Sequence, residues 1–270
     1  MSNLCGFFER TRQAYYKLVH HSLQLELWDQ RILDEVKAIR HRQPRVGTRK
    51  LHRMVNERLK PEGIEVGRDH LFELLRAYNL LIHRRRHPKQ TTDSRHRLRK
   101  YRNLIRDLAL TRPNQAYVAD ITYVETREGF CYLALIMDAY SRKIVGYDLS
   151  RSLSMEGCLR ALQMALAALS GPVELIHHSD RGIQYCSHAY VDLLMKHGVR
   201  ISMTEEQHVY ENAQAERVNG ILKSEFLLGE ILTSYEVAKK LAAEAIKIYN
   251  EERLHLSLDY QTPETVHAAN

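Results

Sequence analysis

Apolar positions in the first 82 residues recur at helical spacing. A helix is predicted over residues 22–41, where the apolar positions are three or four residues apart, and a shorter one over residues 10–19. Two more helices are predicted in GTRKLHRMVNERL and GRDHLFELLRAYNLL, each beginning after a glycine, with Thr48 expected as the N-cap of the first. Residues 1–82 are therefore expected to form a small all-helical region.

The pattern changes beyond Pro113. The runs AYVADITYVET, GFCYLALIMDAY and RKIVGYDLS are rich in β-branched and aromatic residues and are separated by turn residues, which predicts three successive antiparallel strands. Helical and strand-like segments then alternate: SMEGCLRALQMALAAL (helix), VELIHH (strand), HAYVDLLMKH (helix), VRISMT (strand) and HVYENAQAERVNGILKSEF (helix). A last helix is predicted from a capping box between Thr233 and Glu236 to about Asn250. The fold class is therefore α/β, with a mixed five-stranded sheet flanked by helices.

A strongly basic stretch separates the two patterns. Residues 83–106 contain eight Arg and two Lys but one Asp. Like charges at this density repel one another unless phosphates neutralise them, so the segment is expected to bind DNA; the alternative is a solvated spacer. The expected organisation is a helical region over 1–82, a basic linker over 83–112 and an α/β domain over 113–270.

Composition narrows the class of protein. Of the 270 residues, 40 are Lys or Arg and 33 are Asp or Glu, a net charge of +7 that favours a polyanionic partner such as nucleic acid. No signal peptide or membrane-spanning run is recognisable, so a cytoplasmic location is expected. The four cysteines form no C-x-x-C pair, and we expect reduced, mostly buried thiols and no zinc site.

Three acids stand out as candidates for chemistry. Asp120 lies in the middle of a predicted strand, where Asp is disfavoured, and Asp180 directly follows another strand, where ligand sites in such sheets collect. Glu216 lies on a predicted helix. Taken singly, each has a structural alternative: a paired core acid, a turn residue and a surface residue, respectively. Asp138 is interpreted as a turn residue that caps the backbone.

If the two strands are neighbours and the helix packs across their ends, the three acids converge and cannot all ionise without cations. Oxygen ligands favour hard divalent ions, and Mg²⁺ shared with phosphate oxygens is the expected occupant. Two such ions, for which Mn²⁺ is an expected substitute, would support phosphoryl transfer.

The helix predicted over residues 208–226 carries a polar stripe next to its apolar one. Asn212, Glu216, Asn219 and Lys223 fall within about 60° of one another on a helical projection. Lys223 is expected to reach a DNA phosphate as a point charge, and Asn212 and Asn219 are candidates for polar support and DNA contact.

Further DNA contacts are expected in the first half of the chain. Basic residues at one helix start are typical of a helix-turn-helix module, although a plain helical bundle is the alternative. The candidates in this region are Thr48, Arg49 and Lys50, with Arg53 on the same helix; those in the linker are Arg84, Arg85, Arg86, Arg97 and Arg99.

The segments YVADITYV, IHHSDRGIQY and YENAQAERVNGILKSEF resemble the DDE transposase and retroviral integrase superfamily, specifically the OrfB proteins of the insertion-sequence-three family. Asp180 and Glu216 are separated by 35 residues, as in the family's D-D-35-E signature, and Lys223 follows Glu216 by seven. The ending YNEERLHLSLDYQTPETVH and the helical region are also similar. Tyr117 departs from the family pattern, in which Trp is common three residues before the first Asp.

The resemblance implies a ribonuclease H-like catalytic domain in which Asp120, Asp180 and Glu216 bind Mg²⁺ and Lys223 contacts the transposon end. It implies Mg²⁺-dependent cleavage and strand transfer of double-stranded DNA at transposon ends and targets, and a homo-oligomer on DNA. Family members are commonly fused to, or assisted by, an upstream-frame OrfA-type protein, so we expect this chain to be the OrfB portion. The alternatives are a nuclease that only hydrolyses and a catalytically inactive DNA-binding regulator.

Overall fold

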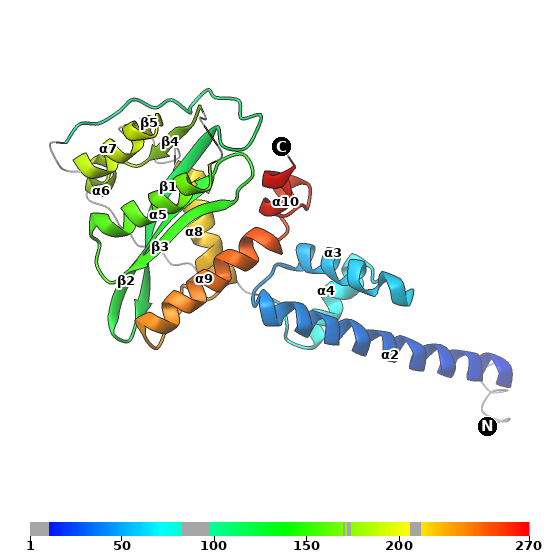
Figure 1. The fold of residues 1–270 in the computed structure, drawn as a ribbon. Helices are drawn as coiled ribbons and strands as arrows, with labels where there is room; N and C mark the ends of the chain where they lie inside the picture. Colours follow the sequence, from blue (N-terminus) through cyan, green and yellow to red (C-terminus); the bar gives the residue numbers. More distant parts are fainter. Residues whose placement is uncertain (1–10, 83–97, 170, 172–173, 206–211, 270) are drawn as a thin grey trace. The chain divides into compact units, whose positions relative to one another are not determined.

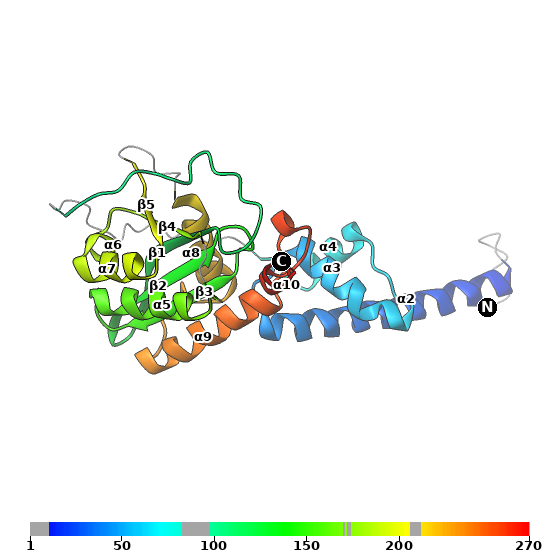
Figure 2. The same ribbon diagram turned by 45° about the horizontal axis from the view of Figure 1, so that its top comes forward.

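The computed structural model describes residues 11–82, 98–169, 171, 174–205 and 212–269. The chain divides into two compact units, Met1–His83 and Arg84–Asn270, which we call the helical unit and the α/β unit. Both are drawn in Figures 1 and 2.

The helical unit begins with one long helix, α2 (Arg12–Arg42), whose N-cap Thr11 accepts a hydrogen bond from the backbone of Ala14. The sequence predicted two helices here, and that prediction was wrong: no Gly or Pro lies between them, and the hydroxyl of Ser22 donates to the backbone oxygen of Leu18 within the continuous helix and does not cap a new one. Only the second half of the helix contributes a continuous core face: Ile32, Leu33, Val36 and Ile39 are buried, whereas Leu23 and Leu27 are 52% and 71% exposed.

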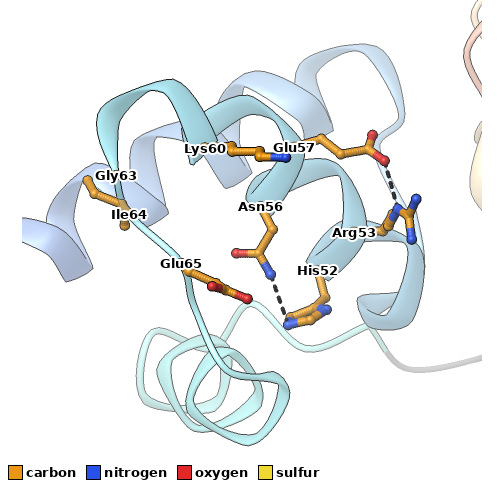
Figure 3. Close-up of a pocket in the computed structure, with 8 residues that line it drawn as sticks. All are labelled: His52, Arg53, Asn56, Glu57, Lys60, Gly63, Ile64 and Glu65. Carbon is orange, nitrogen blue, oxygen red and sulfur yellow. Dashed lines mark hydrogen bonds and ion pairs between the residues drawn. The ribbon is translucent and has the colours of Figure 1, made fainter.

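Helices α3 (Thr48–Leu59) and α4 (Arg68–Ala77) complete the helical unit, with the 3-10 turn η1 (Lys60–Glu62) after α3. Gly47, rather than Thr48, is the N-cap of α3, and no side chain caps it. The loop before α4 is held by Asn56, whose amide exchanges two hydrogen bonds with the backbone of Val66, at 2.9 and 3.1 Å. Asn56 also contacts His52, at 3.2 Å, along the wall of a cavity shown in Figure 3.

The α/β unit is built on the predicted five-stranded sheet. Strands β1 (Ala116–Thr126), β2 (Gly129–Asp138) and β3 (Ile144–Ser150) are antiparallel neighbours. Strands β4 (Ile176–Ser179) and β5 (Arg200–Met203) run parallel to β1. The order β3-β2-β1-β4-β5 places β1 at the centre of a ribonuclease H-like sheet.

Helices cover both faces of this sheet, as Figure 2 shows. Alternate residues of β1 divide between the two cores because successive side chains of a strand point to opposite faces. Tyr117, Ala119 and Ile121 pack with α5 (Met155–Ala167) and α7 (His188–Lys196). Ala116 and Val118 pack with α8 (Ala213–Glu225) and α9 (Tyr235–Glu251).

Several details differ from the sequence-based expectation. The N-cap of α9 is Ser234, whose side chain accepts from the backbone of Val237, so the predicted capping box between Thr233 and Glu236 was wrong. Three short elements were not predicted: the helices α6 (Ile183–Cys186) and α10 (Pro263–Ala268), and the 3-10 turn η3 (Leu256–Leu258). Within the described residues, no helix is both long and apolar enough to cross a bilayer.

The cysteines that the structure describes are reduced and buried, as expected; these are Cys131, Cys158 and Cys186. Cys5 lies outside the described residues. The predicted turn role of Asp138 is also confirmed: its carboxylate is fully buried and accepts hydrogen bonds from the backbone and hydroxyl of Ser141, each 2.7 Å, and from the backbone of Asn114, 2.8 Å.

Candidate active site

Asp120 is the central acid of the site. It occupies the middle of the central strand β1, opposite Leu135 of β2. By the alternation of the strand it belongs to the face that α8 covers. Its carboxylate accepts two hydrogen bonds, from the backbone N–H of Ile121 at 2.9 Å and from the amide of Asn219 on α8 at 2.8 Å. The strand and the helix therefore both fix the orientation of this acid.

Asp180 follows β4 and comes beside Asp120 through strand register. Val118 of β1 pairs with His178 of the parallel β4. Two residues further along each strand lie Asp120 and Asp180, so continuation of the parallel register brings them to the same level of the sheet. The Asp180 carboxylate also accepts a hydrogen bond from the backbone N–H of Gly182, at 2.9 Å, which fixes the turn after β4.

Glu216 reaches this place from α8. Two asparagines one turn to either side attach the helix to β1: the Asn212 amide donates to the backbone oxygen of Ala119, at 3.1 Å, and Asn219 donates to Asp120. Glu216 lies between them on the same stripe of the helix, with an exposed side chain. The strand register and the helix thus bring the elements that carry the three acids together, and a joint site formed by the acids stays a prediction.

The pKa of Asp120 responds to the neighbouring acids Asp180 and Glu216. Burial, which is the largest cause, and the neighbouring carboxylates of Asp180 and, more weakly, Glu216 together raise the pKa of Asp120 to about 7. The hydrogen bonds from Ile121 and Asn219 act in the opposite direction but do not prevail. Ionisation of Asp120 beside the other two carboxylates is therefore unfavourable until a cation compensates the negative charge.

The cluster is open rather than a closed cage. Among the described residues, no three His, Cys, Asp or Glu side chains lie close enough together to hold a metal ion. Mg²⁺ is commonly bound through one or two carboxylates, with water and substrate phosphates completing its coordination. The oxygen-only donor set of Asp120 and Asp180, and the mutual repulsion of the acids, fit that manner of binding.

Lys223 lies on the same stripe of α8, about two turns from Glu216. Its ammonium nitrogen sits 4.8 Å from the centroid of the Tyr123 ring on β1. This cation–π contact holds the charge against the sheet three residues along from Asp120. Sequence reasoning missed Tyr123, although an aromatic residue in the same strand as a candidate acid was the available signal.

Other candidate residues are placed differently from the expectation. Asn212 and Asn219 are 5% and 6% exposed with amides directed at β1, so they are not surface ligands for DNA, and that assignment is corrected. Lys50 is likewise buried, at 5%, so its proposed DNA contact is corrected too. Arg49 is exposed at the start of α3, whereas Thr48 beside it is partly buried.

Of the DNA-contact candidates in the basic linker, the structure describes Arg99. The Arg99 guanidinium stacks over the Tyr101 ring at 5.0 Å. Lys100, Tyr101 and Arg102 line a shallow cavity together with Arg181, the residue after Asp180. The remaining candidates lie outside the described residues; these are Arg84, Arg85, Arg86 and Arg97.

Comparison with known proteins agrees with this arrangement. Two family models described as integrase core domain match residues 111–208 and 197–263. A 31 kDa uncharacterized protein of insertion element IS600 from Shigella sonnei is 38% identical over 265 residues, covering 96% of each chain. The transposase of insertion sequence element IS629 from the same organism is 33% identical over 234 residues, or 87% of this chain and 75% of the relative.

The InsF transposase of insertion sequence IS3A from Escherichia coli K12 is 38% identical over 153 residues, or 56% of this chain and 53% of that protein. Among solved structures, the HTLV-2 integrase catalytic core domain in complex with magnesium matches 62% of this chain and 99% of its own, with 18% identity and a TM-score of 0.46. Since IS600 and IS629 relatives match most of both chains at above 30% identity, and the acids keep the D-D-35-E spacing, this chain belongs to the insertion-sequence-three family of DDE transposases.

Proposed function

We propose that the chain catalyses Mg²⁺-dependent cleavage and strand transfer at the DNA ends of its insertion element. The observation that carries the proposal is the junction of β1, β4 and α8, where Asp180 and Glu216 act on the pKa of Asp120. Binding of a divalent metal would account for an acid with so high a pKa in a member of a transposase family.

In this mechanism Asp120 and Asp180, from the sheet, and Glu216, from the helix, would hold the metal together with phosphate oxygens of the substrate. Bound Mg²⁺, as a pair of ions or with Mn²⁺ in its place, would supply Lewis-acid activation of the attacking oxygen and stabilisation of the leaving one. Asn219 keeps the Asp120 carboxylate turned toward the cluster through its hydrogen bond. The ammonium group of Lys223 would neutralise a phosphate of the bound strand, either after breaking its contact with the Tyr123 ring or while keeping it.

The bonds made and broken balance without a covalent protein intermediate. Water attacks a phosphodiester at the element's end, its proton passes to solvent, and the P–O bond to the 3′ oxygen breaks to release a 3′-OH. That hydroxyl then attacks a second phosphodiester in line, forming a new P–O bond while another strand oxygen leaves. By family resemblance, the first joining links both ends of the element on one strand, and the circle is integrated later.

The partners belong to the same proposal. Double-stranded DNA of the element's ends and of the target would be the substrate, bound by a homo-oligomer that brings two ends together, with an OrfA-type protein as a possible assistant. In the helical unit, the exposed Arg49 at the start of α3 is the described residue best placed for end recognition. The site of action would be the bacterial cytoplasm, on the DNA itself.

The test is a cleavage and joining assay with labelled element ends and Mg²⁺, comparing the wild type with Glu216→Gln. The variant keeps the shape of the side chain but loses its charge, so cleavage and joining should be abolished while DNA binding by gel shift is retained. A variant that joins ends at the normal rate would overturn the proposal. Supplying an oligonucleotide with a 3′-OH separates the alternatives, because a nuclease that only hydrolyses would cut without forming a joined product.

A further inference from the structure

A second cavity lies in the α/β unit, between α8, the β2–β3 turn and the C-terminal end of α9. Its volume is about 430 Å³, within the range of small-ligand sites. The residues used below are Arg142 from the turn, Gln214, Arg217 and Ile221 from α8, and Leu256 from the segment after α9. The elements that surround it are labelled in Figure 1.

This cavity is separate from the acid cluster because it faces the other flank of α8. At 100° per residue, Gln214, Arg217 and Ile221 share one flank, about 160° away from the stripe of Glu216, Asn219 and Lys223. The buried apolar face of α8 lies between the two flanks. The cavity is therefore lined by residues that take no part in the acid cluster.

Arg142 occupies a position that is unfavourable for its backbone conformation and for its charged side chain. Its φ of 65° lies in the left-handed region, which Gly or Asn occupies at less cost. Its side chain is partly buried, and this burial lowers the pKa of the guanidinium. Across the described residues no ion pair joins it to an acid: the Asp138 carboxylate attracts it electrostatically, but the oxygens of that carboxylate accept their hydrogen bonds from Ser141 and Asn114. A partly buried guanidinium at a cavity wall, with a left-handed backbone and no ion pair, points to a function.

Arg217 adds a second guanidinium for which the described residues supply no ion pair. It is exposed on α8, and no described acid forms an ion pair with it. The third arginine of the cavity, Arg253, is different: it forms a two-pronged ion pair with Glu225, both distances 2.9 Å, and is structural. Beside Arg217, the buried Gln214 Oε1 atom has no hydrogen-bond partner within the described residues. The cavity thus presents the guanidinium groups of Arg142 and Arg217 and an amide oxygen of Gln214 that has no hydrogen-bond partner within the described residues.

We propose that this cavity binds a nucleotide, with its phosphate between Arg142 and Arg217 and its base against Ile221 and Leu256. Guanidinium groups match phosphate oxygens in a two-pronged geometry. The apolar wall, with Leu256 52% exposed, suits a planar base better than it suits a bare phosphate. The Gln214 amide oxygen would accept a hydrogen bond from an exocyclic amine of the base. That the nucleotide belongs to a DNA strand rests on the proposed function; the phosphate preference does not.

The test measures binding to the full chain in EDTA by titration calorimetry, with three probes: inorganic phosphate, dAMP and a short single-stranded oligodeoxyadenylate. The variant is Arg142→Asn combined with Arg217→Gln, since Asn suits the left-handed backbone. Its matched control is Arg127→Gln, which removes one exposed charge from the β1–β2 turn. Loss of two charge-assisted contacts should weaken dAMP and oligonucleotide binding by about tenfold or more.

The three probes identify the source of the ligand. Oligonucleotide binding that is stronger than dAMP binding, and lost in the double variant, supports a strand of DNA. Binding of dAMP alone supports a free nucleotide. Equal dissociation constants for the double variant and the wild type would overturn the site, as would inorganic phosphate binding as tightly as dAMP, because the base would then contribute nothing.

Failure of the proposed function is distinguishable from failure of this inference. Glu216→Gln should bind the oligonucleotide at this cavity as the wild type does, because Glu216 lies on the opposite flank of α8. Should the chain lack Mg²⁺-dependent cleavage yet lose nucleotide binding in the double variant, the cavity stands without the transferase. Thermal unfolding of both variants shows whether they are folded.

Discussion

The Asn219 amide donates a 2.8 Å hydrogen bond to Asp120, and so couples the orientation of the central acid to the position of α8. Asn219 is buried, so its contribution is to position Asp120.

Asn219→Ala should therefore reduce kcat without weakening DNA binding. A lost hydrogen bond to a charged group is worth about 1.5 to 3 kcal/mol, or roughly ten- to a hundredfold in rate. Because the amide lowers the pKa of Asp120, its removal should move the acidic limb of the pH–rate profile to higher pH. Ser224→Ala, on the exposed side of the same helix, is the control. A uniform loss of rate with an unmoved profile would mean a structural defect.

Asp120→Asn should stabilise the metal-free protein at pH 8. Since the folded pKa is raised to about 7, above its unfolded value, folding resists ionisation, and wild-type stability is lost as pH rises from about 4 to 7. The amide does not ionise, so the variant avoids a penalty of up to a few kcal/mol and should unfold several degrees higher. Thermal unfolding in EDTA at pH 8 and pH 4.5 measures this, and the difference should be much smaller at pH 4.5, which lies close to the unfolded pKa.

Asp148→Asn provides a control of opposite sign. Burial alone would raise the pKa of Asp148, but hydrogen bonds from Arg160, 2.8 and 2.9 Å long, and from Ser150 prevail and lower it. A carboxylate with a lowered pKa adds stability above its unfolded pKa, and that contribution is lost as pH falls. This variant should be destabilised at pH 8 and less so in acid.

Mg²⁺ should raise the melting temperature of the wild type at pH 8, because a ligand that binds only the folded state stabilises it by mass action. Without DNA the effect should be small and need millimolar metal, since the acid cluster is open. Asp120→Asn and Asp180→Asn should abolish it, and Mn²⁺ should act like Mg²⁺. An undiminished Mg²⁺ response in both variants would place the metal elsewhere.

Lys223→Ala should weaken binding of the element's end and lower the slope of log K against log salt by about one, as expected for one phosphate contact. Lys223→Arg should recover part of the affinity because it keeps the charge. Lys240→Ala, exposed on α9, is the comparison. A slope that is the same in Lys223→Ala and Lys240→Ala would assign Lys223 to the Tyr123 contact alone.

Asn56→Ala should destabilise the helical unit by about 1 to 3 kcal/mol, because the backbone N–H and C=O of Val66 lose their partners together. Glu57→Ala on the same helix removes only an exposed ion pair with Arg53 and should cost less than about 1 kcal/mol. Denaturant titration compares the two. Equal losses would show that the loop before α4 does not depend on Asn56.

The strands of the α/β unit could be predicted because each combines β-branched residues with turn residues at its ends. The three acids were selected because Asp120 violates strand preference and because Asp180 and Glu216 have the D-D-35-E spacing; their role as a site stays a prediction. Directions of side chains could not: Asn212 and Lys50 share helix faces with exposed residues, and only the packing of neighbouring elements buries them. The left-handed backbone of Arg142 could not be predicted, because Gly and Asn are the residues that indicate such a conformation and Arg is not.

The setting of Asp120 in the central strand has a consequence for inhibitor design. β1 pairs with β2 through ten residue pairs and with β4 through three, so Asp120 and the turn that carries Asp180 form a stiff wall. Glu216 has an exposed side chain whose rotamers are not fixed by packing. A chelating compound should therefore be shaped to the sheet side, with its donor atoms preset for Asp120 and Asp180, while the helix side tolerates variation in size.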